Sequence, residues 1–138
     1  MTNQITYITV TDTGDEADAP VFAVHTCDRD KFGKAVNAHV GGIFDCVTVV
    51  ISDEYADCWV NDEGLLIGLP LNRFATAANS GRRLVGTAVI TGTADREGNV
   101  TSVSTNLIDS IYLWEILFSP MTVTLSDRSA IDLITNTP

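Results

Sequence analysis

Asn72 and Arg73 are the residues of this sequence best suited to bind an anion. Asn is a preferred N-cap, and a helix that begins after Asn72 would point the free N–H groups of its first turn outward from the positive end of the helix dipole. That geometry binds phosphate or carboxylate groups. Arg82 and Arg83 could lie close by, after the turn at Gly81. Three of the eight basic residues thus fall within eleven positions, a local enrichment of positive charge. We therefore predict an anion site around these four residues.

An aromatic side chain near this site would extend the range of ligands. Phe74 or Trp59 could stack on a base, so a nucleotide-like small molecule is the anion that we expect. An alternative interpretation is a capped helix whose exposed arginines pair with Asp62 and Glu63, since caps and surface ion pairs are common. Both interpretations remain open from the sequence.

Other groups that could do chemistry lack the spacing that chemistry requires. The carboxylates predicted on turns at one end of a hairpin match neither the EF-hand nor another metal motif, so we expect no metal site. These residues are Asp53, Glu54, Asp57, Asp62 and Glu63. His25 and Cys27 share one face of a predicted strand, but no third group orients them, and a structural role is the better interpretation of both histidines.

No recognised catalytic or nucleotide-binding motif is present, so we expect no cofactor and favour a protein without catalytic activity. The three cysteines form no CxxC pair, which argues against a disulfide framework and a structural zinc site. A small enzyme of unknown reaction remains an alternative.

The elements that must position these residues follow from the apolar pattern. We predict strands over 4–11, 21–27, 43–52, 58–61, 84–92 and 121–125, and helices over 29–40, from Asn72 to Asn79, and over 106–118. The strand at 43–52 is β-branched almost throughout and is expected to be central and buried on both faces. Asp28 is the predicted cap of the first helix, Gly41-Gly42 its end, and Gly64 the residue with positive φ in the turn that follows 58–61. Ser104 or Thr105 is the predicted cap of the last helix.

This order of elements predicts an α+β fold with a mixed or antiparallel sheet and two to three helices packed on one side. We expect a single domain over 1–138, because no linker divides the chain. Residues 12–20 are rich in acids and are predicted to be a mobile turn, and 126–138 a flexible tail. No motif in residues 93–138 indicates their role.

The net charge of −10 restricts the possible partners. It makes direct nucleic-acid binding unlikely, because an acidic chain is repelled by phosphate backbones. No apolar run reaches the roughly 18 residues of a membrane span, and residues 1–19 lack the features of a secretory signal, so we expect a cytoplasmic protein. An acidic surface could also imitate DNA and occupy a DNA-binding protein.

A family resemblance is carried by Gly41-Gly42-Ile43-Phe44, by VNDEGLLIGLPLNRFAT at 60–76 and by the VGTAV strand from Val85. The chain resembles a small domain family of unknown function found in actinobacterial bacteriophages and related bacteria. The match covers about 30–92. The resemblance implies a phage or prophage accessory protein that acts in the cytosol of the host.

These observations favour a non-enzymatic accessory protein that works by binding. It would sequester either a nucleotide-like anionic small molecule, at Asn72, Arg73, Arg82 and Arg83, or a host protein. The alternative of a DNA mimic, or of another inhibitor of a host DNA-binding or defence protein, remains open. The protein could also be an oligomer.

Overall fold

A computed structural model describes the backbone of residues 3–118 and the side chains of residues 3–113. Its elements follow in the order β1 (Gln4–Thr11), β2 (Val21–Asp28), a 3-10 turn (Arg29–Lys31), α1 (Phe32–Val40), β3 (Phe44–Ile51), β4 (Glu54–Asn61), α2 (Arg73–Ala78), β5 (Ala88–Thr91) and α3 (Thr105–Phe118). The five strands form one sheet in the order β2-β1-β5-β4-β3, and every pair of neighbours is antiparallel. The predicted α+β single domain is confirmed.

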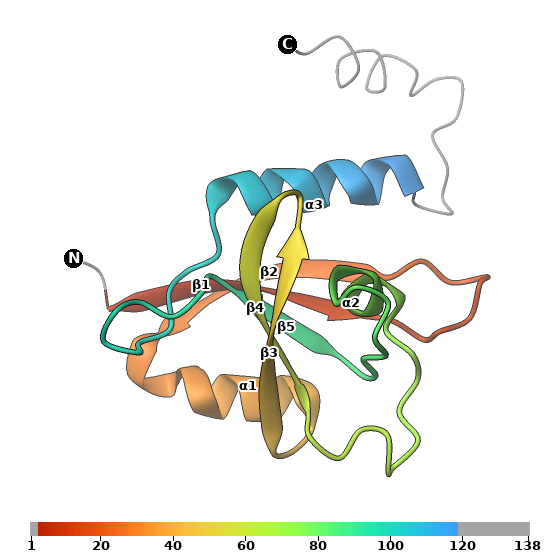
Figure 1. Ribbon diagram of the computed structural model, residues 1–138, viewed down its shortest axis with the longest axis horizontal. Coiled ribbons are helices and arrows are strands. Elements are labelled where there is room, and N and C mark those ends of the chain that lie inside the picture. Colours follow the sequence, from red (N-terminus) through yellow and green to blue (C-terminus); the bar gives the residue numbers. More distant parts are fainter. Residues whose placement is uncertain (1–2, 119–138) are drawn as a thin grey trace, which may run out of the picture.

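The two faces of the sheet are covered by different helices (Figure 1). Because side chains alternate along a strand, Ile5 and Tyr7 of β1 face one way and Ile8 and Val10 face the other. The first pair belongs to a core with α1, which lies below the sheet in Figure 1, and the second pair to a larger core with α2 and α3, of which α3 lies above the sheet. The helices are therefore divided between the faces, whereas the sequence predicted them on one side.

Helix α1 has the amphipathic pattern that its burial requires. Phe32, Val36 and Val40 recur at helical spacing, and all three are buried against the sheet. The helix ends at Gly41, whose φ of 81° is the left-handed conformation that glycine adopts most easily. Asp28 is the N-cap of the 3-10 turn that leads into α1, although its side chain makes no capping hydrogen bond, so the predicted end is confirmed and the predicted cap is confirmed in position alone.

Strand β3 is an edge strand, and the prediction that it is central is wrong. It pairs with β4 alone in the described sheet, through a turn at Ser52 and Asp53 that both adopt positive φ. The β-branched run Val47–Ile51 indicated burial on both faces, but within this run Val49 and Ile51 are buried in the larger core, while Val50 is 49% exposed. The hairpin is longer than predicted, because β4 begins at Glu54 instead of Cys58.

Two predictions lie outside the described residues, namely the strand at 121–125 and the tail at 126–138. Within 3–118, none of the helices combines the length and the apolar character needed to cross a membrane. The predicted cytoplasmic location stays a prediction.

A candidate binding cleft between α2 and β3

Asn72 is the N-cap of α2, as the sequence predicted, but its side chain is fully buried. Its Oδ1 accepts a hydrogen bond of 3.0 Å from the backbone N–H of Ala75. Its Nδ2 donates to the carbonyl oxygens of Val10, at 3.0 Å, and Gly86, at 2.9 Å. The amide therefore joins α2 to β1 and to the segment before β5, and it is not available to a ligand.

The anion at the start of α2 is a side chain of the protein itself. Asp12 accepts hydrogen bonds at Oδ2 from the backbone N–H of Arg73, at 2.8 Å, and from its Nε, at 2.9 Å. Its Oδ1 accepts from Nη2 of Arg73 at 2.7 Å and from the N–H of Gly14 at 3.0 Å. The helix end and the guanidinium of Arg73 thus bind an anion, as predicted from their chemistry, and this anion is the Asp12 carboxylate. Arg73 pairs with Asp12 and not with Asp62 or Glu63.

The electrostatics of this pair follow from its burial and geometry. The Asp12 side chain has no exposed surface, while that of Arg73 is 32% exposed. Burial raises the pKa of Asp12, but the hydrogen bonds from Arg73 and Gly14, together with the charge of Arg73, outweigh burial and lower that pKa to about 2. The pair is therefore fully ionised at neutral pH and joins two segments 61 residues apart.

The acidic turn at 12–20 carries further internal hydrogen bonds. Thr13 donates from Oγ1 to Asp18, and Asp15 accepts from the N–H of Ala17. Asp18 also accepts at its carbonyl oxygen from Arg73. The turn is tied to the start of α2 by these contacts, and its predicted mobility stays a prediction.

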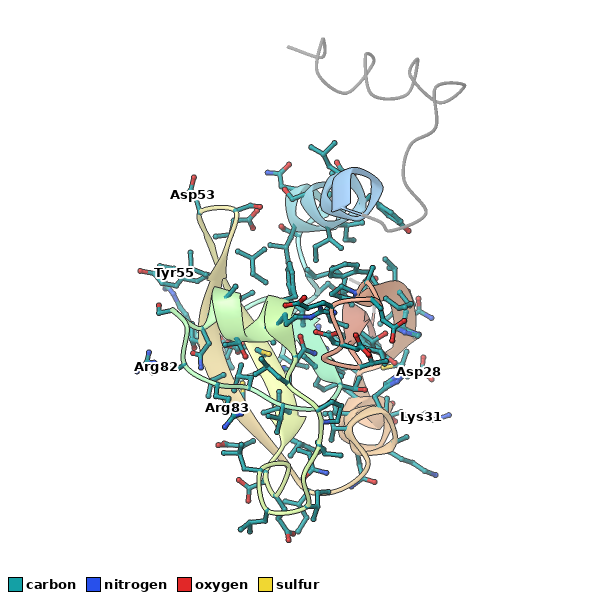
Figure 2. The ribbon with its side chains drawn as sticks, turned by 90° about the vertical axis from the view of Figure 1, so that its right-hand side faces the viewer. Asp28, Lys31, Asp53, Tyr55, Arg82 and Arg83 are labelled. Atoms are coloured by element: carbon teal, nitrogen blue, oxygen red, sulfur yellow. The ribbon has the colours of Figure 1, made fainter. Side chains whose placement is uncertain are left out.

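Arg82 and Arg83 do not join Arg73. Both are exposed, and neither makes a salt bridge with any described residue. Figure 2 shows them on the outer surface of the molecule, on the side that also carries Tyr55. Arg73 and Arg83 line different cavities, so the structure does not bring these two arginines together at one site.

Trp59 and Phe74 lie on opposite faces of the sheet. Trp59 packs edge-on against Phe32 and Phe44 on the α1 side, and its indole N–H donates to Oγ1 of Thr91 at 3.0 Å. Phe74 contacts the larger core and packs edge-on against Phe22, with ring centroids 5.1 Å apart. These two rings cannot stack on the same ligand.

Arg73 and Phe74 are the two predicted site residues that share a cavity. A cleft of about 340 Å³ lies between α2 and the end of β3, and its volume is in the lower part of the range of small-molecule sites. Its walls are mostly apolar and are formed by Val50, Ile51, Ser52, Arg73, Phe74, Ala77 and Ala78. Nη1 of Arg73 makes no hydrogen bond to the described part of the protein. The cleft can hold an apolar group next to one available donor.

Residues 15–115 match the domain of unknown function DUF3846. The chain belongs to this family. The expected membership of a domain family of unknown function is confirmed, over a longer stretch than 30–92, whereas the expected origin in actinobacterial phages stays a prediction. No curated protein and no solved structure matches the chain.

The DUF3846 domain also contains a cluster that the sequence did not predict. The imidazoles of His25 and His39 lie with centroids 4.8 Å apart, and Nε2 of His39 is 2.9 Å from the hydroxyl of Tyr7. Burial, and then the neighbouring His25, lower the pKa of His39. The sequence placed His25 on a strand and His39 on a helix. It could not show that the two rings lie together, because their contact depends on where α1 crosses the sheet. Nε2 of His25 is engaged by Thr9, so both rings have structural partners.

Proposed function

We propose that this DUF3846 domain is a non-catalytic binding protein that receives an extended, apolar segment of another protein in the cleft between α2 and β3. The observation that carries the proposal is that one wall of the cleft is the end of an edge strand. An incoming strand could hydrogen bond to the outer edge of β3 and direct alternate side chains into the cleft. Edge strands provide main-chain affinity, and the adjacent pocket provides selectivity.

The chemistry of the walls fits such a segment better than it fits a free anion. Phe74, Ala77, Ala78 and Val50 offer apolar surface, and Ser52 adds a hydroxyl at one end. The charge of Arg73 is already balanced by Asp12 at 2.7 Å, so the cleft has little net attraction for a phosphate. The segment that we expect has apolar side chains at alternate positions.

The biological role that we infer is that of an accessory protein that sequesters a host protein. This role follows from the expected origin in actinobacterial phages or prophages, which stays a prediction. The DNA-mimic alternative rests on the net charge of −10 and stays a prediction.

A nucleotide-like ligand is a second candidate for the same cleft, because Arg73 and Phe74 both line it. A base could lie against the ring of Phe74 while a phosphate accepts a hydrogen bond from Nη1 of Arg73. The internal pairing with Asp12 weakens this candidate relative to the first.

A binding screen with a blocked cleft tests the proposal. Ala77 is exposed on α2 and lines the cleft, so Ala77→Glu would place a charged side chain in it. Ala38→Glu is the matched control, because Ala38 is also exposed but lies on α1, at the opposite face of the sheet. Both variants keep a good helix former at the substituted position.

The screen uses an array of octapeptides with alternating apolar and polar residues, and a panel of nucleotides measured by thermal shift. We expect peptides to bind and Ala77→Glu to weaken them by at least about tenfold, roughly 1.4 kcal/mol, with Ala38→Glu unchanged. If nucleotides bind and peptides do not, the second candidate replaces the first. If nothing binds, or if Ala77→Glu binds as well as the unmodified protein, the cleft is not the site.

A further inference from the structure

We propose that Leu65, Leu66 and Ile67 form a second binding surface, which inserts into an apolar surface flanked by lysines or arginines on a partner protein. These three consecutive side chains are 64%, 85% and 59% exposed. A run of exposed large apolar residues is unfavourable in water, and such a run indicates an interaction site. This turn, called here the Leu65–Ile67 turn, shares no residue with the α2–β3 cleft, so the inference does not depend on the proposed function.

The backbone of the Leu65–Ile67 turn is held by hydrogen bonds at both ends. The N–H of Ile67 donates to the carbonyl of Glu63 at 3.1 Å, and the N–H of Leu69 donates to the carbonyl of Gly64 at 3.0 Å. The side chain of Asn61 accepts from the N–H of Glu63 at 2.8 Å and donates to the carbonyl of Val40 at 3.0 Å. The apolar side chains are therefore presented on a backbone fixed to the core, which lowers the entropy cost of binding.

Two glycines allow the ends of the turn to pack closely. A Cβ at Gly64 would lie 2.8 Å from Cγ2 of Val85, and one at Gly86 would lie 2.7 Å from Cδ1 of Leu69. Gly64 was predicted to have positive φ, but the residue of this loop with positive φ is Gly68, at 73°. Gly64 is thus required for close approach. The chain buries Leu69 partly and leaves the three preceding apolar side chains outside.

The charges around the turn indicate the chemistry of the partner. Asp62 and Glu63 are separated from the turn by Gly64 alone, both are exposed, and neither forms a salt bridge within the described residues. A cleft of about 180 Å³ opens between Leu65, Asp62 and Asp45, with Arg83 as its one basic wall residue. An apolar surface rimmed with lysine or arginine would satisfy both the leucines and the unpaired carboxylates.

The alternatives fit these charges less well. An anionic membrane would be repelled by Asp62 and Glu63, and a second copy of this chain would bring together two proteins of net charge −10. The turn follows Asn61, at one end of the β3–β4 hairpin. Asp53 lies at the other end, at the tip that Figure 2 labels. One partner could therefore contact the turn while another ligand occupies the α2–β3 cleft.

A pair of synthetic helical peptides tests this inference. One peptide carries leucines on one face flanked by lysines, which is a minimal form of the proposed partner surface, and the other carries glutamates in place of the lysines. Binding to the full chain is measured by fluorescence anisotropy at low and at physiological salt. Leu66→Ser removes the most exposed apolar side chain, and Tyr55→Ser is its control, because Tyr55 is 74% exposed on the β3–β4 hairpin.

Charge is tested separately from apolar contact. Asp62→Asn with Glu63→Gln removes two charges at the turn, while Glu16→Gln with Asp53→Asn removes two exposed charges elsewhere. We expect the lysine peptide to bind, Leu66→Ser to weaken it by at least about tenfold, and the double variant at the turn to weaken it and reduce its salt dependence. The two control variants should leave binding unchanged.

Other outcomes would overturn the inference. These are equal binding of the glutamate peptide, no binding of the lysine peptide, or equal losses in the turn and control variants, which would indicate attraction to the net charge alone. Co-sedimentation with phosphatidylcholine vesicles, if abolished by Leu66→Ser, would assign the turn to a membrane instead. A dimer in sedimentation velocity that Leu66→Ser dissociates would assign it to a second copy of the chain.

Discussion

Replacing Asp12 with asparagine tests the most specific electrostatic feature of the fold. The carboxylate has a pKa of about 2 in the folded protein against an ordinary value of 3.8. At about 1.4 kcal/mol for each pKa unit, this difference stabilises the folded state by about 2 kcal/mol at neutral pH. The asparagine side chain would keep the shape of the aspartate but lose the charge and part of the hydrogen bonding to Arg73. We expect Asp12→Asn to lower the free energy of unfolding by about 2–3 kcal/mol at pH 7.

The pH dependence distinguishes this mechanism from a general loss of packing. Because the folded-state pKa of Asp12 is lower than the unfolded-state value, its contribution is complete above pH 3.8 and is lost as the pH falls towards 2. About half of the difference between the two proteins should therefore remain at pH 3. Urea unfolding at pH 7, 5 and 3 measures the difference in the free energy of unfolding between the two proteins. Glu16→Gln is the control, because it changes the net charge by the same amount. A difference below about 0.5 kcal/mol at pH 7, within the range of ordinary surface substitutions, would refute the reasoning, as would a difference independent of pH.

Three further results are expected from the packing and hydrogen bonds. Asn72→Ala should lower the free energy of unfolding by about 2–4 kcal/mol in urea unfolding, because it removes the cap of α2 and leaves two buried carbonyl groups without their donor. Gly86→Ala, at φ 79° and against Leu69, should destabilise by more than about 1 kcal/mol, whereas Gly33→Ala in α1, where a Cβ meets nothing within 4 Å, should stabilise by up to about 1 kcal/mol. An NMR titration should give His39 a pKa below 6.5, so that its contribution to stability decreases as the pH falls below 6.5; a pKa at or above 6.5 would contradict the burial of this ring.

Local signals were sufficient to predict most of the elements. Alternation of apolar residues located β1 at its observed bounds, and the capping preference of Asn72 located the start of α2. Ser104 accepts a hydrogen bond at Oγ from the N–H of Leu107, so it is the one of the two predicted residues that caps α3. These features depend on residues within a few positions of each other.

The arrangement of the elements depends on long-range contacts, and there the sequence was less informative. The run Val47–Ile51 has the composition of a buried strand, but its place at the sheet edge is set by how the two hairpins join through β5. The partner of Arg73 is Asp12, which lies in a segment predicted as a solvated turn. The capping preference of Asn72 therefore located the helix end, but the sequence could not show that an internal carboxylate occupies it.

The most direct test of the central claim is to map the bound segment on the protein by NMR. The tightest octapeptide from the array is titrated into the ¹⁵N-labelled chain. Binding between α2 and the edge of β3 should shift the amide signals of 48–52 and 73–78 and leave those of α1 unchanged. Shifts confined to α1 and β2, or spread evenly over the sheet, would contradict the claim that the α2–β3 cleft is the binding site.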